Sequence, residues 1–321
     1  MDKYRKTIRW ILALCCLAYI IWFFAKNTEQ LKLVFRLPPL MLVTMAFLIV
    51  LSHLVYSYRF NIILQKCSGY SVPLWPWFKM VLLGRFLSTF APQAGNIYRS
   101  VCLKKNYQIP YTRYASSFFS FAWMDTCLNM IYAVAVILAV KPDLRLAGFK
   151  ALNLLVILIA LIAVTPILFV VLFRITEFHN KRLAWLHSKL AEMLTVSVNS
   201  LGDGAYMLKM VITGIIAFIN SIVILYICFV SLNISIILPS LALFYVVLKL
   251  STQILITPGN LGVREIAYGI LSEQMGIGMA QGIIVSAVIR ILGSCVVIVL
   301  GTVFGGIDLL RHRKDYAKSQ Q

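Results

Sequence analysis

Long apolar stretches separated by short polar ones run along almost the whole of this 321-residue chain. Leu, Ile, Val, Phe and Met follow one another without the strict alternation of membrane β-barrel strands. Because about 20 apolar residues in a helix span the hydrocarbon core of a bilayer, the pattern predicts an all-α polytopic membrane protein. The expected spanning helices, about six in number, lie at residues 8–25, 40–62, 115–140, 150–173, 206–231 and 279–306.

Two further apolar segments are interrupted by proline and glycine, which break helices. They are 76–94, which ends at Pro92–Gly95, and 236–275, which is broken at Pro258–Gly262. We expect each to enter the membrane as a re-entrant, broken hairpin and to leave on the same side. The chain would then have eight membrane segments.

Composition excludes an ordinary soluble domain. The chain is 61% hydrophobic and 13% charged, whereas soluble domains are about 45–50% apolar and about 25% charged. Its net charge of +19 would suggest nucleic-acid binding in a soluble protein, but cytoplasmic loops of membrane proteins collect Lys and Arg. No nucleic-acid-binding motif is present, so no nucleic-acid partner is expected.

The distribution of Lys and Arg favours the re-entrant arrangement. If every apolar segment crossed the bilayer, residues 95–114 would carry Arg99, Lys104, Lys105 and Arg113 to the outside, against the positive-inside rule. With two re-entrant hairpins, most of the 30 Lys and Arg residues lie on one side, together with both chain termini. The sequence therefore predicts a multi-pass protein of the cell membrane with cytoplasmic termini.

The same arrangement implies an inverted-topology repeat. Each half of the chain contains two helices, a broken hairpin and a further helix, and the halves have opposite orientation. Residues 1–146 would form the first repeat and 147–310 the second, with 311–321 as a basic cytoplasmic tail of a single membrane domain.

The two breaks are the strongest candidates for a binding site. Paired proline- or glycine-interrupted segments in the halves of a repeat indicate a transport site, and non-helical backbone at membrane depth is tolerated only beside protein or a water cavity. The alternative is a simple kink or a tight loop between ordinary helices. Candidate substrate-binding residues at and near the breaks are Arg85, Pro92, Gly95, Asn96, Arg99, Pro258, Gly259, Asn260, Gly262, Arg264 and Glu265.

Charged residues inside predicted helices add two candidates. Asp125 and Arg290 lie in equivalent helices of the two halves, and charges at the bilayer centre usually face a cavity or each other. They could line or brace one central cavity, or they could be a structural pair or extend to the interface. Lys209 and Lys249 are expected to extend to the membrane surface.

Motifs for catalysis, metals and cofactors are missing from the sequence. The seven cysteines form no CxxC pair, and the four histidines have no metal-ligand spacing. No HExxH, GxSxG, Walker or GxGxxG motif is present. We expect no metal, no cofactor and no catalytic residue of a recognisable type.

One of the breaks resembles a known family signature. The "PGGxGxxE" pattern of the lysylphosphatidylglycerol synthase transmembrane-region family is similar to the run Pro258-Gly259-Asn260-Leu261-Gly262-Val263-Arg264-Glu265, with Asn260 in place of the second glycine. The earlier Pro92, Gly95 and Arg99 resemble that family's first loop. The resemblance covers nearly the whole chain, but the family's soluble aminoacyl-transferase domain has no counterpart here.

This resemblance implies a flippase-like transporter, whose substrate would be a membrane lipid with an anionic or phosphate-bearing head group, either a phospholipid or a polyprenyl-linked lipid. One alternative is an integral-membrane glycosyl- or lipid-transferase that uses a polyprenyl-phosphate donor, with Glu265 or Asp125 as general base. Another is a non-transporting partner of envelope-biosynthesis enzymes. The sequence leaves the oligomeric state open.

Overall fold

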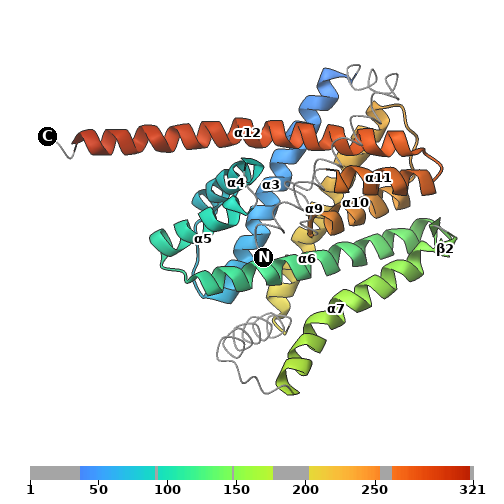
Figure 1. Ribbon diagram of the computed structural model, residues 1–321, viewed down its shortest axis with the longest axis horizontal. Coiled ribbons are helices and arrows are strands. Elements are labelled where there is room, and N and C mark those ends of the chain that lie inside the picture. The colour runs from blue at the N-terminus through green and yellow to red at the C-terminus, as the bar shows by residue number, and fades with distance from the viewer. Residues whose placement is uncertain (1–36, 91–92, 147, 176–201, 254–261, 319–321) are drawn as a thin grey trace, which may run out of the picture.

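The computed structural model describes residues 37–90, 93–146, 148–175, 202–253 and 262–318. These residues are helical apart from short connections and one two-stranded hairpin (Figure 1). The helices are α3 (Pro39–Ser68), α4 (Leu74–Phe90), α5 (Ala94–Tyr107), α6 (Tyr111–Val140), α7 (Ala151–Ile175), α9 (Gly204–Ser231), α10 (Leu238–Gln253), α11 (Val263–Gln274) and α12 (Met279–Lys318). The predicted helix at 8–25 lies outside the described residues.

Four of these helices are long and apolar enough to cross a membrane: α3, α6, α9 and the Met279–Gly305 part of α12. Their outer faces carry large apolar side chains, as on α9, where Ile212, Ile216, Ile219 and Val223 form one exposed stripe. A stripe of this kind suits lipid rather than water. The prediction of an essentially all-helical chain is confirmed for the described residues, and its four long apolar helices are consistent with the predicted polytopic membrane protein.

Local sequence signals set the helix ends. Pro39 and Tyr111 follow prolines and open α3 and α6, and Pro39 itself occupies the first turn, where its missing N–H is not needed. Gly69 ends α3 in the left-handed conformation with φ 76°. Asp203 caps α9, because its carboxylate accepts a hydrogen bond from the Tyr206 amide over 3.1 Å.

Two helical hairpins, α4–α5 and α10–α11, lie at the predicted breaks. The second corresponds to the predicted segment 236–275, whereas the first extends beyond the predicted end at 94. The first bend passes through Gln93, which is left-handed with φ 66°. Its two helices touch backbone to backbone, since a Cβ atom on Gly95 would overlap the carbonyl oxygen of Gly84. In the second hairpin, α11 starts after Gly262 with φ 85°, and residues 254–261 lie outside the described part.

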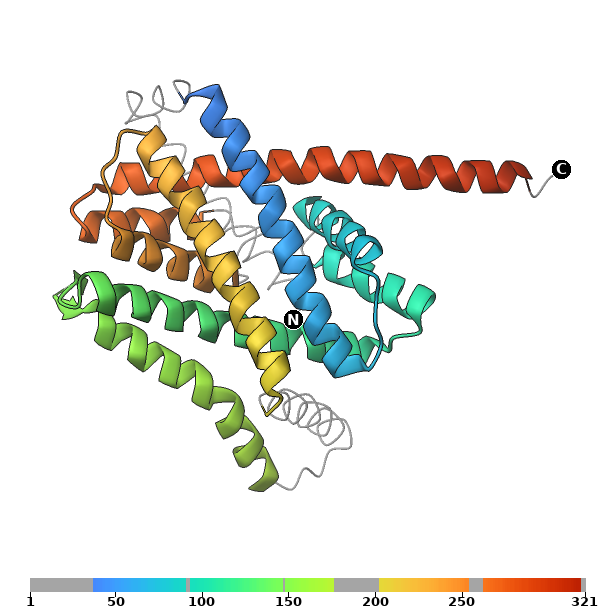
Figure 2. The ribbon, with the colours of Figure 1, turned by 180° about the vertical axis from the view of Figure 1, so that it is seen from behind.

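The hairpins pack across the molecule. Helix α4 lies against α12, and α10 lies against α6, so each hairpin contacts a long helix from the other half of the chain. At the centre, α3 packs along α9, as both Figure 1 and Figure 2 show. Apolar side chains fill these interfaces in two clusters, one of which surrounds the fully buried Trp77.

Several boundaries differ from those expected. Residues 95–107, expected as a cytoplasmic loop, form the helix α5, which buries one face and exposes Lys104 and Lys105. Helix α3 continues to Ser68, beyond the expected end at 62, so Arg59 lies well inside it. Arg145–Leu146 and Phe149–Lys150 pair as two short antiparallel strands, β1 and β2, because the chain reverses there between α6 and α7. Helix α12 continues beyond 306, to Lys318.

Candidate functional site

The first broken hairpin places two arginines close together. Ser88 Oγ accepts a hydrogen bond from the Gly95 amide over 3.1 Å, which holds the start of α5 against α4. Arg99 packs over Gly84, the residue that precedes Arg85 in the chain. The positive charges of Arg85 and Arg99 therefore lie near enough to repel each other. The contact depends on the missing side chains of Gly84 and Gly95.

Arg99 is 6% exposed and is held at two of its nitrogens. Its Nε donates to the carbonyl oxygen of Gly95 over 3.2 Å, and its Nη2 donates to Asn96 Oδ1 over 2.6 Å. Asn96 Oδ1 also accepts from the hydroxyl of Tyr114 over 3.2 Å. The third nitrogen, Nη1, is buried and has no hydrogen-bond partner among the residues that the structure describes.

Arg85 is fixed by an aromatic ring instead of a carboxylate. Its guanidinium carbon lies 4.5 Å from the ring centre of Tyr56 on α3, a distance typical of cation–π contacts. Its buried Nε lacks a hydrogen-bond partner within the described ranges, as does Nε2 of His53, which lies near it on α3. We refer to Arg85 and Arg99 as the arginine pair.

No acidic side chain in the described part of the chain neutralises the arginine pair. One charged side chain at the bilayer centre costs roughly 2.5–3.5 kcal/mol on insertion scales. Two neighbouring guanidinium groups add mutual repulsion to that cost. Such a site suits an anion that binds both groups, and guanidinium is the side-chain group best matched to phosphate.

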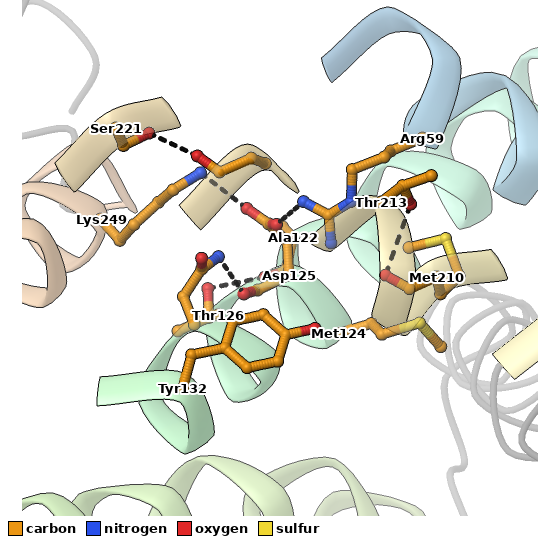
Figure 3. A network of polar contacts seen from close by, with 12 residues as sticks. Arg59, Ala122, Met124, Asp125, Thr126, Tyr132, Met210, Thr213, Ser221 and Lys249 are labelled. Carbon is orange, nitrogen blue, oxygen red and sulfur yellow. Dashed lines mark hydrogen bonds and ion pairs between the residues drawn. The ribbon is translucent and has the colours of Figure 1, made fainter. Parts of the chain in front are cut away.

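A second polar cluster lies between α3, α6 and α10 (Figure 3). Asp125 on α6 is buried and forms ion pairs with Arg59 Nη1 and, over 2.8 Å, with Lys249 Nζ. This charged triad holds two cations and one anion, and Arg59 is only 2% exposed. The triad joins three helices, one of which comes from the second hairpin.

The triad corrects one expectation, that for Lys249, and argues against one of the alternatives for Asp125. Lys249 does not extend to the membrane surface as expected; it lies against Asp125, because a buried carboxylate without a partner would be costly. Asp125 and Arg290 do not pair with each other, since each has another partner of opposite charge. Sequence reasoning missed Arg59, whose only signal was its place inside the expected helix 40–62.

The second hairpin carries its own ion pair. Glu265 Oε1 lies 2.6 Å from Arg290 Nε, and Arg290 Nη2 donates to Glu265 Oε2 over 3.2 Å. Glu265 Oε2 also accepts from the Gly262 amide over 2.9 Å. One carboxylate thus holds the start of α11 and fixes it to α12.

Arg264 forms two hydrogen bonds with one residue of α12. Its Nε donates to Ser286 Oγ over 3.1 Å, and its Nη2 donates to the Ser286 carbonyl oxygen over 3.0 Å. Arg264 has no carboxylate partner within the described ranges. Pro92, Pro258, Gly259 and Asn260 are candidate site residues that lie outside the described residues.

The three clusters together contain six cationic side chains, namely those of Arg59, Arg85, Arg99, Lys249, Arg264 and Arg290, and two acidic ones, those of Asp125 and Glu265. The excess of positive charge within an apolar fold favours an anionic ligand over a cationic one. Within the described residues, no group of His, Cys, Asp and Glu side chains could hold a metal ion.

Comparisons with known proteins give one result. No curated protein and no solved structure matches the chain. Residues 10–301 match the family described as the lysylphosphatidylglycerol synthase TM region. The match covers most of the 321 residues and confirms the resemblance seen at residues 258–265. The chain therefore belongs to the lysylphosphatidylglycerol synthase transmembrane-region family.

Proposed function

We propose that this chain is a flippase-like transporter that moves a lipid with an anionic, phosphate-bearing head group between the leaflets of the cell membrane. The observation that carries the proposal is the arginine pair. Arg85 and Arg99 lie beside a helix break, and no described acidic residue neutralises them. Membership of a membrane family named for a lipid synthase supports a lipid as the ligand.

An inverted repeat would allow the binding site to open to each side of the membrane in turn. In this proposal residues 1–146 and 147–310 are the two repeats, with eight membrane segments, re-entrant hairpins and cytoplasmic termini. Support comes from the crossed packing, in which α4 lies on α12 as α10 lies on α6, with α3 against α9 between them. Rocking of one repeat against the other would expose a site at the breaks to each side in turn.

Arg264 would provide a second contact for the head group. Its two hydrogen bonds to Ser286 leave further N–H groups of the guanidinium for a ligand. Gly262 and the neighbouring Pro258, Gly259 and Asn260 would shape the second break. Pro92, Gly95 and Asn96 would do the same at the first break, where Asn96 already positions Arg99.

The two carboxylates suit bracing better than proton transfer. Asp125 is held by two cations, and Glu265 by a guanidinium and a backbone amide. A general base needs an oxygen within reach of the substrate proton, but the oxygens of Asp125 and Glu265 are already bound in ion pairs with cations of the protein. The geometry therefore favours the transporter over the lipid- or glycosyl-transferase.

Mass spectrometry of lipids that remain bound after gentle purification tests this proposal. We expect a phosphate-bearing lipid to be enriched over its share of the membrane, and the enrichment to disappear in Arg99→Gln. Lys104→Gln, on the exposed face of the same helix, is the matched control and should retain the lipid. Bulk lipids in equal amounts in all three proteins would contradict the proposal and favour a non-transporting partner of envelope-biosynthesis enzymes.

A further inference from the structure

The charge of the arginine pair indicates how many negative charges the head group carries. Salt bridges compensate Arg59, Lys249 and Arg290 at least in part, since Asp125 lies between Arg59 and Lys249, and Glu265 binds Arg290. The arginine pair has no such compensation from the residues that the structure describes. A ligand with one negative charge would leave one of these two positive charges unbalanced in an apolar region.

Each arginine of the pair has one buried nitrogen without a hydrogen-bond partner in the part of the chain that the structure describes. The guanidinium carbon of Arg85 lies 4.5 Å from the ring centre of Tyr56, and the buried Nε of Arg85 has no hydrogen-bond partner within the described residues. Asn96 and the Gly95 carbonyl orient Arg99 through Nη2 and Nε, which leaves the buried Nη1 unpartnered within the described residues. Buried charged donors without acceptors are costly, and ligand oxygens would satisfy them.

We infer that the arginine pair binds a lipid head group that carries two negative charges, as in a terminal phosphate monoester or a diphosphate. A monoester presents three terminal oxygens that share this charge, whereas a phosphodiester presents two oxygens that share a single charge. The site would therefore select dianionic lipids over ordinary phosphodiester lipids and over lipids whose head group carries an amino acid cation. This inference rests on the proposed lipid transport and specifies its substrate class.

Binding of two defined lipids to the purified full-length protein tests the inference. The probes are phosphatidic acid, a phosphate monoester, and phosphatidylglycerol, a phosphodiester, with the same acyl chains. At pH 8 we expect phosphatidic acid to bind at least about tenfold more tightly, because an additional hydrogen bond between charged groups is worth this much or more. The preference should shrink as the pH falls through about 6, where the second phosphate proton returns.

Variants of Arg85 and Arg99 test whether the arginine pair causes the preference for phosphatidic acid over phosphatidylglycerol. Arg99→Gln and, separately, Arg85→Gln should reduce the preference for phosphatidic acid by about tenfold, whereas Lys104→Gln should leave it unchanged. Gel filtration and the midpoint of thermal unfolding identify a variant that fails to fold. The comparison of the two lipids on the wild-type protein needs no variant.

The results separate the inference from the function on which it rests. Equal binding of both lipids, with both lost in Arg99→Gln, would overturn the dianionic selectivity and leave lipid transport standing. Inorganic phosphate that binds as tightly as phosphatidic acid would overturn the assignment to a lipid. Absence of binding by either lipid to the folded wild-type protein would overturn the inference and the proposed function together.

Discussion

Lys249 Nζ on α10 lies 2.8 Å from Asp125 Oδ2 on α6, and this ion pair joins residues 124 positions apart in the sequence. The same carboxylate binds Arg59 on α3 (Figure 3). Because α10 belongs to the second hairpin, the contact links the two halves of the chain. Asp125 is therefore the residue whose loss should disturb the packing between the halves most.

Asp125→Asn should destabilise the protein by about 3 kcal/mol, because it leaves two buried cations without a counter-charge. Lys249→Met should cost less, since Arg59 would still neutralise Asp125. Thermal unfolding in detergent checks the order of the two variants. A larger loss for Lys249→Met would contradict the central role of Asp125.

The Glu265–Arg290 pair should show thermodynamic coupling. In a double-mutant cycle with Glu265→Gln and Arg290→Gln, the coupling should reach about 1 kcal/mol or more, as expected for contacting residues. The matching cycle for Asp125 and Arg290 should give about 0.5 kcal/mol or less, since each has a different partner. Equal coupling in the two cycles would contradict the pairing.

Gly95→Ala should displace α5 from α4, because the new methyl group would overlap the carbonyl oxygen of Gly84. We expect a loss of at least about 1 kcal/mol, which is typical of overpacking. Gly293→Ala is the control: its Cβ would meet open space on α12, and alanine favours a helix by up to about 1 kcal/mol. The unfolding midpoint should fall in the first variant and hold or rise in the second.

The contacts of Asp203 predict how the stability of the fold changes with pH. Its side-chain contact with Lys66 over 2.6 Å and its bond to the Tyr206 amide hold its pKa below the usual value. A carboxylate with a lowered pKa stabilises the fold above its unfolded pKa of about 3.9, and this stabilisation is lost as the pH falls through the folded pKa. Its contribution should therefore be constant near neutral pH and disappear in acid.

The matched variants for Asp203 are Asn and Ala. Asparagine can still cap α9 but cannot pair with Lys66, so Asp203→Asn should unfold at a higher temperature than Asp203→Ala. The difference between wild type and Asp203→Asn should vanish at low pH. A difference that persists unchanged in acid would show that the ion pair with Lys66 contributes nothing.

The sequence allowed much of the fold to be predicted, because length and hydropathy determine which segments can span a bilayer. Predicted 206–231 corresponds to α9 (Gly204–Ser231), and predicted 115–140 to α6 (Tyr111–Val140). Helix α5 was missed because its Lys104 and Lys105 resemble a cytoplasmic loop. One face of α5 is buried because α4 packs against it, and the sequence alone does not show this contact.

Side-chain partners could not be predicted in the same way. Periodicity places Asp125 in a helix, but its partner Lys249 is 124 residues away. Arg59 lies near the end of the expected helix 40–62, where long charged side chains often extend to the interface between membrane and water. Arg99 resembled one more cytoplasmic cation, and its burial follows from the contact between Gly84 and Gly95.

Movement of a lipid between leaflets is the central claim, and a vesicle assay tests it most directly. Full-length protein is reconstituted into vesicles that contain head-group-labelled phosphatidic acid in both leaflets, and a phosphatase that cannot cross the membrane is added outside. We expect wild-type vesicles to lose label from both leaflets, while Arg99→Gln vesicles and protein-free vesicles lose only the outer-leaflet share. Loss limited to the outer leaflet in wild-type vesicles, with folded protein present, would contradict the account.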